Sequence, residues 1–316
     1  MTGILYLMAC AVPAAAADGW WNAEWAFRQR VSLYTAELAE DLVDFPVTLL
    51  LDDGMFARSR AQVDGHDLRA VAPDGSPLDF EIVRWSPAGV EVNVFMPKIV
   101  AGVANQFFDL YYGNPKAVAL PPKPHWDAHY RMVMHLNGNL DDDARGGVGA
   151  TAEGKVAIGD VARFQGDPAF LHVAPERLAG LGQQRPSTQT LASGRRLDDR
   201  VEWFNFGLKT PRTVHTNAMS NGQGAPELNP EGIAPGEWHA AIVVYDARNH
   251  TRTICIDGTV LERDSALPGP LEIQEMRIGR GVLHFDPWQF TGAMDEVRLS
   301  DVARADGWIR AEAACL

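Results

Sequence analysis

Clustered carboxylates are the clearest candidates for chemistry in this sequence. Asp141, Asp142 and Asp143 form an acidic run that a glycine-rich stretch follows. Carboxylate oxygens and backbone carbonyls are the ligands that calcium prefers, so Asp142 and Asp143, joined by Asp295 near the C-terminus, are candidate calcium ligands. In the alternative, Asp143 caps the turn by accepting hydrogen bonds from backbone amides, while Asp141 and Asp142 are solvated. The sequence has no strict calcium-loop spacing here, which favours the turn cap.

The carboxylates also lack the spacing that catalysis needs. Glycoside hydrolysis uses two carboxylates held about 5 to 9 Å apart. Asp295 and Glu296 are adjacent, so on a strand they would point to opposite faces and could not act together. The sequence contains neither a G-x-S-x-G nucleophile elbow nor an H-E-x-x-H zinc motif. We therefore expect a protein that is not an enzyme.

Aromatic side chains in loops are candidates for sugar binding, because the face of an indole ring packs against apolar groups while its N–H stays available for a hydrogen bond. The segment H-F-D-P-W-Q at residues 284–289 reads as a loop. We predict that Trp288, together with Phe285, contacts a ligand.

The composition limits the partners. The formal charge is −13 with a pI near 5.1, so the basic surface that nucleic acid or an anionic membrane would need is not expected. Residues 3–17 form an apolar run that ends in small residues, which is typical of a signal peptide removed before Asp18. In the alternative, Cys10 is acylated and anchors a lipoprotein. Both interpretations predict export to the periplasm or cell surface, with no membrane span in the mature chain.

Two cysteines remain after such a cleavage, Cys255 and Cys315. An even pair in an oxidising compartment predicts a disulfide. A buried free thiol at Cys255 is the equal alternative.

Short apolar stretches separated by turn signals dominate the rest of the chain. We expect strands at 27–34, 45–51, 68–71, 80–85, 90–96 and 107–112, and then a proline-rich spacer at 120–124. Strands without intervening helices predict an all-β protein of two antiparallel β-sandwich domains, at 18–120 and 121–316.

The C-terminal motifs carry a family resemblance. The sequence G-A-M-D-E-V-R-L-S at 292–300, followed by A-R-A-D-G-W-I-R-A-E at 303–312, resembles the last strand and closing helix of a laminin G-like (LamG), concanavalin A-like jelly roll. Residues 238–258 resemble a strand pair of the same family. One departure is the polar stretch G-Q-Q-R-P-S-T-Q-T at 182–190, where the family has an apolar strand. We expect that strand to be shortened or lost, which would open one face of the sandwich.

The upstream segments at 44–51, 64–69, 78–85 and 110–115 resemble a bacterial domain of unknown function (family 2341) that commonly precedes a LamG domain in envelope proteins. The two resemblances imply an exported protein that recognises a glycan or protein partner through its LamG half. A second possibility implied by the resemblance is an accessory component of an ExbB/TolQ-type proton-channel complex, and a glycoside hydrolase is the third. A glycan array and a pull-down from membranes distinguish the first two.

Overall fold

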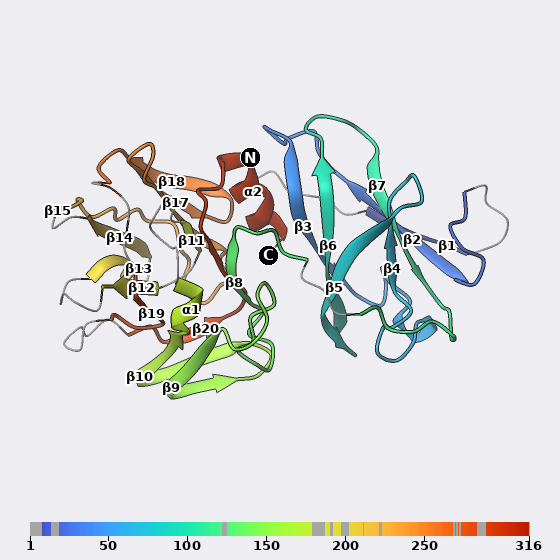
Figure 1. The fold of residues 1–316 in the computed structure, drawn as a ribbon, viewed down its shortest axis with the longest axis horizontal. Helices are drawn as coiled ribbons and strands as arrows, with labels where there is room; N and C mark the ends of the chain where they lie inside the picture. Colours follow the sequence, from blue (N-terminus) through green and yellow to red (C-terminus); the bar gives the residue numbers. More distant parts are fainter. Residues whose placement is uncertain are drawn as a thin grey trace. The chain divides into compact units, whose positions relative to one another are not determined.

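The computed structural model describes residues 8–13, 19–121, 125–178, 187–189, 192–196, 202–210, 212–220, 223–267, 269, 271, 273–282 and 289–315. The chain divides into two compact units, residues 1–126 with 314–316 and residues 127–313 (Figure 1). None of the described helices is long and apolar enough to cross a membrane.

The described strands of the first unit form an antiparallel sheet in the order β1-β2-β7-β4-β5-β6-β3. Their bounds are β1 Met8–Pro13, β2 Phe27–Leu33, β3 Leu42–Leu51, β4 Arg69–Val71, β5 Pro77–Ser86, β6 Gly89–Ile99 and β7 Gln106–Tyr112. β5 pairs with β4 through its first two residues and with β6 through the others. Alternation along β2 buries Val31 and Leu33 and leaves Arg28 and Arg30 on the other face, beside Asp109 of β7.

The second unit contains two antiparallel sheets. The first has the order β15-β14-β13-β12-β19-β10-β20, with β9 paired to β10, and the second has the order β18-β17-β16-β11-β21-β8. Their bounds are β8 Tyr130–Met134, β9 Ala150–Ile158, β10 Ala162–Val173, β11 Ser187–Gln189, β12 Ala192–Arg195, β13 Glu202–Thr210, β14 Thr213–Ser220, β15 Gln223–Gly224, β16 Ala241–Asp246, β17 Thr251–Ile256, β18 Thr259–Asp264, β19 Glu275–Ile278, β20 Gly292–Met294 and β21 Val297–Ser300. The helices are α1 Pro175–Leu178 and α2 Asp306–Cys315.

The main core of the second unit lies between its two sheets. Phe204, Phe206 and Ile278 from the first sheet belong to one buried cluster with Val243 and Ile254 from the second. This arrangement confirms the predicted all-β fold of antiparallel sandwiches.

The helix α2 packs on the outer face of the second sheet. Ile309 of α2 is buried in one cluster with Ile242, Val244 and Cys255, which point away from the main core. Cys255 therefore faces the helix, on the opposite face of β17 from Ile254, which belongs to the main core.

The closing motif is two strands rather than one. β20 belongs to the first sheet and β21 to the second, and the chain crosses between them at Asp295 and Glu296. Glu296 has a left-handed backbone with φ 53°, which strand geometry does not allow. The expectation that Asp295 and Glu296 point to opposite faces of one strand is therefore wrong.

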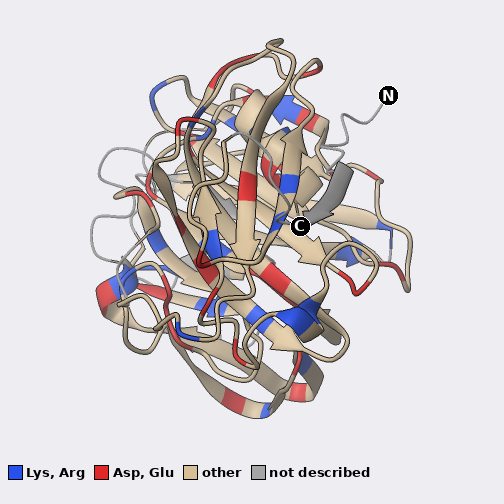
Figure 2. Ribbon diagram, turned by 90° about the vertical axis from the view of Figure 1, so that its right-hand side faces the viewer, with Lys and Arg blue, Asp and Glu red and all other residues tan. Residues whose placement is uncertain are grey.

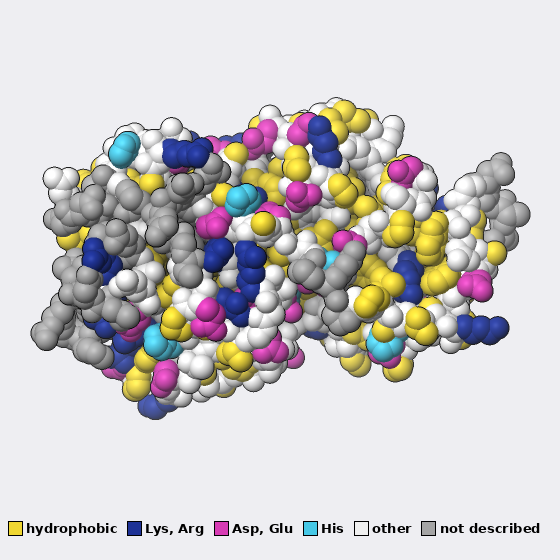
Figure 3. All heavy atoms as spheres, in the orientation of Figure 1, with side chains coloured by type: hydrophobic (Ala, Val, Ile, Leu, Met, Phe, Trp, Pro, Cys, Tyr) yellow, Lys and Arg dark blue, Asp and Glu magenta, His cyan; other side chains and the backbone are white. Residues whose placement is uncertain are grey.

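Charged residues of both signs are interspersed over the strands and loops (Figure 2). Among the described residues, most of the exposed large hydrophobic side chains belong to the first unit, where yellow spheres form several patches on the face shown in Figure 3. In the described part of the second unit, the large exposed hydrophobic residues are Val148, Leu208 and Trp238. Trp238 has the highest exposure of the three, 63%.

Candidate functional site

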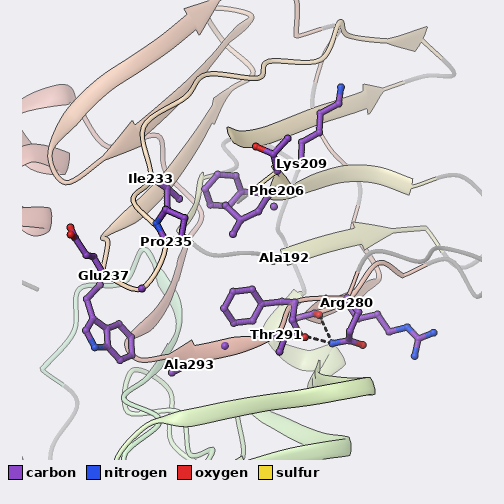
Figure 4. A pocket seen from close by; sticks show the side chains of 18 of the residues that line it. Ala192, Phe206, Lys209, Ile233, Pro235, Glu237, Arg280, Thr291 and Ala293 are labelled. Carbon is purple, nitrogen blue, oxygen red and sulfur yellow. Dashed lines mark hydrogen bonds between the residues drawn. The ribbon is translucent and has the colours of Figure 1, made fainter. Parts of the chain in front are cut away.

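The second unit contains a hollow of about 960 Å³ at the end of its first sheet. Its described lining comes mainly from residues 205–210 of β13, the loop at 233–238, the segment at 279–281 after β19, and residues 289–293 leading into β20. Figure 4 shows the ring of Phe206 turned toward Ile233 and Pro235 of the loop. The charged ends of Lys209 and Arg280 point away from that ring.

The strand β12 borders the hollow through Ala192. Ala192, the first residue of β12, pairs with Phe206 of β13 on one side and with Ile278 of β19 on the other. Earlier in the chain, residues 187–189 form β11, which lies in the opposite sheet. Of the polar stretch at 182–190, residues 187–189 are thus a strand of the second sheet, and the other residues lie outside the described part of the chain. The expected shortening of a strand, and the open face that it would give, stay a prediction.

A close-packed wall closes one side of the hollow. The Gln289 amide nitrogen donates to the carbonyl oxygens of Ala169, Gly279 and Phe290 at 2.6, 2.9 and 2.9 Å. Gly279 has φ +90°, and a Cβ there would lie 2.5 Å from the ring of Phe164, so only glycine fits. The side-chain amide of Gln289 therefore supports the wall.

The opposite side is the loop that carries Trp238. Pro235 and Gly236 form a turn in which the Glu237 N–H donates to the Ala234 carbonyl at 3.3 Å, and Gly236 has φ +88°. Proline followed by a glycine of positive φ is the signature of a type II turn. Trp238 follows directly and lines the hollow with most of its side-chain surface exposed.

Charged side chains stand at the rim. Arg280 Nη1 lies 2.6 Å from Asp167 Oδ1, and Lys209 Nζ lies 2.6 Å from Glu227 Oε2. The lining itself, as far as the structure describes it, contains the single carboxylate of Glu237. The hollow can offer apolar surface, glycine-rich backbone and a few charged groups.

The two ligand-binding residues predicted from the sequence cannot be placed relative to this site. Phe285 and Trp288 lie outside the described residues, although Gln289, the next residue, lines the hollow. Sequence reasoning missed Trp238, which we had placed at the start of a family strand. Its signal was available in A-P-G-E-W at 234–238, where a proline-glycine turn presents a tryptophan just before β16.

The acidic turn is organised around Asp142 rather than Asp143. Asp142 is buried, and its Oδ1 accepts hydrogen bonds from the backbone N–H groups of Val133 and Ala144 at 3.0 Å each. Its Oδ2 lies 2.8 Å from Nε of Arg177. Asp143 is exposed. The expectation that Asp143 caps the turn and Asp142 is solvated is wrong, because the carboxylate of Asp142 is the one that points into the turn.

The side chains of the predicted calcium ligands Asp142, Asp143 and Asp295 do not converge on one point where they could hold an ion together. Among the described residues, no group of three or more His, Cys, Asp or Glu side chains is placed to hold a metal ion. Calcium binding stays the alternative to the turn cap that the sequence favours, and a melting experiment decides between them.

Thermal melting tests calcium binding directly. An ion bound only by the folded state at a hundredfold excess over its dissociation constant would add about 2.7 kcal/mol of stability, or several degrees. Because N–H donors and Arg177 already occupy the Asp142 carboxylate, we expect melting curves in calcium and in chelator to coincide. Curves separated by several degrees would contradict this, and magnesium serves as the control ion.

A second cluster of titratable groups is buried between β8, β21 and α2. Arg298 contacts Oε2 of Glu296 through Nη2 at 2.9 Å and Oε1 of Glu312 through Nη1 at 3.2 Å. Tyr130 donates to the same oxygen of Glu312 at 3.0 Å, and His135 Nδ1 lies 2.5 Å from Oε1 of Glu296. None of these five side chains lines the hollow. We interpret the cluster as structural.

The two cysteines of the predicted disulfide are both buried and are not bridged to each other in the structure. Burial raises the pKa of the Cys255 thiol to about 12, although the backbone of Gly258 opposes the shift. A thiol with such a pKa is a poor nucleophile at neutral pH.

Comparison with known proteins agrees with this architecture. Residues 183–310 match the family model of the concanavalin A-like lectin/glucanases superfamily. The chain therefore contains a concanavalin A-like, LamG-like domain at residues 183–310, and a second β-sandwich domain lies upstream. The resemblance of that first domain to the domain of unknown function 2341 stays a prediction. No curated protein matches this chain.

Solved structures with a detectable likeness include carbohydrate-active proteins. The CBM40 of Ruminococcus gnavus IT-sialidase, bound to α2,3-sialyllactose, is 10% identical, with a TM-score of 0.37, 43% of this chain covered and 85% of that chain. Domain 4 of the Geobacillus stearothermophilus arabinanase AbnA, with arabinotriose, is 18% identical, with a TM-score of 0.40 and coverage of 59% and 98%. A Trypanosoma rangeli sialidase complex is 10% identical, with a TM-score of 0.46 and coverage of 78% and 44%. All three TM-scores lie below 0.5.

Proposed function

We propose that the second unit binds a carbohydrate in the hollow, with Trp238 as its stacking platform. The observation that carries this proposal is the 63% exposure of Trp238 at the rim of a concave site. An exposed indole at the rim of a concave site offers a ligand an apolar face to pack on and an N–H that can donate a hydrogen bond.

The chemistry of the lining supports a sugar ligand. A sugar ring has an apolar C–H face, which packs on an aromatic ring, and an edge of hydroxyls, which need donors and acceptors. Phe206, Ile233 and Pro235 supply apolar surface, while the exposed side chains of Lys209 and Thr210 bring polar groups to the same lining. The volume lies at the upper end of the usual range for ligand pockets. The family match, to a superfamily of lectins and glucanases, includes all segments of the lining except Arg163.

The same lining favours binding over cleavage. Glycoside hydrolysis requires a pair of carboxylates, and Glu237 is the single carboxylate in the described lining. The adjacent carboxylates of Asp167 and Glu227 are engaged by Arg280 and Lys209. We therefore propose a non-enzymatic binding protein, exported as its N-terminal sequence predicts.

A glycan array with the full chain tests the proposal. We expect at least one class of oligosaccharide to be retained, and to be recovered from the protein with its length unchanged. Retention of no glycan by protein whose circular dichroism shows a folded β-sandwich would contradict binding. Shortened products that persist in repeated preparations would contradict the non-enzymatic assignment.

The ExbB/TolQ-type membrane complex stays an alternative partner from the sequence resemblance. A pull-down from solubilised membranes tests it. Recovery of the protein with such a complex, together with no glycan bound on the array, would favour this alternative.

A further inference from the structure

The side chain of His239 fastens the loop that carries Trp238. Its ring is mostly buried, and its Nδ1 lies 2.8 Å from Oδ2 of Asp257, in the turn between β17 and β18. Oδ1 of the same carboxylate accepts the Ala240 N–H at 2.9 Å. Asp257 thereby holds both the ring of His239 and the backbone directly after it.

The other ring nitrogen reaches across the loop to the start of the turn. Nε2 lies 3.0 Å from the backbone nitrogen of Ala234 and 3.1 Å from its carbonyl oxygen. In the sequence, Trp238 thus lies between two fixed points, the turn that begins at Ala234 and the side chain of His239. We call the contacts of His239 with Asp257 and Ala234 the clamp. The loop has a second constraint, because Pro235 and Gly236 fix the turn geometry.

The two contacts of Nε2 belong to different protonation states. A neutral ring that donates from Nδ1 to Asp257 has a lone pair on Nε2, which accepts the Ala234 N–H. A protonated ring donates from Nε2 to the Ala234 carbonyl and forms an ion pair with Asp257. Hydrogen bonds with one ionised partner are stronger than neutral ones, and in the protonated state both ring contacts are of this kind.

We propose that His239 is a positioning residue that holds Trp238 at the rim of the hollow, and holds it more firmly when its imidazole is protonated. The inference rests on the proposed function only for the role of Trp238 in binding. The clamp would make the site pH-sensitive, firm at acidic pH and looser as the pH rises above about 6.5.

The charges around His239 set the direction of this effect. Burial lowers the pKa of His239, but the contacts with Asp257 and Ala234 outweigh burial, so its pKa is raised above the ordinary value. Glu237, in the same loop, acts in the same direction, and Asp257 is the charged group that faces the ring from β17 and β18. A raised folded pKa means that the stabilisation is complete below the unfolded pKa and is lost as the pH rises through the folded one.

A fluorine probe at Trp238 tests the clamp without any glycan. The full chain would be labelled with 5-fluorotryptophan, and the Trp238 resonance assigned by its loss in Trp238→Phe. We expect this resonance to shift between pH 5 and pH 9 with a midpoint above about 6.5, the unperturbed value for histidine. In His239→Gln the shift should disappear. In Asp257→Asn, which keeps an acceptor but removes the charge, the midpoint should fall by about one pH unit.

The matched control is His129→Gln. His129 forms the same kind of contact, Nδ1 to Asp301 Oδ1 at 3.0 Å, but on a different loop. It should leave the Trp238 titration unchanged. A Trp238 resonance that does not titrate in the wild type, or that titrates equally in His239→Gln, overturns the inference. Neither result bears on the glycan array, so failure of the clamp and failure of the proposed function are distinguishable.

Discussion

Trp238→Ala is expected to weaken glycan binding by about 10- to 100-fold without unfolding the protein. Covering roughly 100 Å² of an indole face with a sugar would contribute about 2.5 kcal/mol, and each 1.4 kcal/mol is a factor of ten in affinity. The expected range is wide because buried area converts only partly into affinity. Trp238 is already exposed in the free protein, so its truncation removes few contacts of the folded state. We expect a stability change within about 0.5 kcal/mol.

Isothermal titration with the oligosaccharide retained on the array measures this effect. Trp238→Phe should keep part of the affinity, because a smaller aromatic face remains. The matched control is Val148→Ala, an exposed hydrophobic residue of the same unit that does not line the hollow. Equal affinities for the wild type and Trp238→Ala would show that the glycan binds elsewhere.

The regular strands were predictable because their signal is local. Alternating apolar residues and turn signals placed β2, β5, β6 and β7 close to their observed bounds. The closing motif was recognised but read as one strand. Its crossing between sheets depends on the left-handed backbone of Glu296, which is held by the tertiary contacts of its carboxylate with His135 and Arg298.

The candidate site was less accessible to sequence reasoning because its lining comes from segments far apart in the chain, at 205–210, 233–238, 279–281 and 289–293. The polar stretch before β12 led to the prediction of an open face, but it does not indicate which residues line a site. Trp238 fitted a family strand pattern, and its exposure follows from the turn at Pro235 and from the clamp by His239, which joins residues 239 and 257. The burial of Asp142 likewise depends on Arg177, 35 positions along the chain, whose charge no local pattern associates with the turn.

Arg298→Met is expected to destabilise the second unit by about 3 to 5 kcal/mol. The side chains of Arg298 and Glu312 are each 1% exposed, so removing the cation leaves two carboxylates without their shared partner. Breaking a buried ion pair from one side carries a cost of this size, because a charge remains buried. Urea unfolding followed by circular dichroism measures it. The control is Arg263→Met, whose partner Asp306 is exposed, and we expect a loss below about 1 kcal/mol.

The pH dependence of the destabilisation by Arg298→Met shows whether the variant loses an ion pair or only side-chain packing. Burial alone raises the pKa of Glu296, but the charges of His135 and Arg298 outweigh it and lower the pKa to about 2. Its unfolded value is near 4.5. The ionised carboxylate therefore contributes stability above pH 4.5, and this contribution, about 3 kcal/mol, is lost as the pH falls toward 2. The difference between wild type and Arg298→Met should be largest above pH 5 and should shrink below pH 4. A difference that is constant from pH 7 to pH 3 would mean that Arg298 stabilises the unit by packing, because only the ion pair responds to protonation of Glu296.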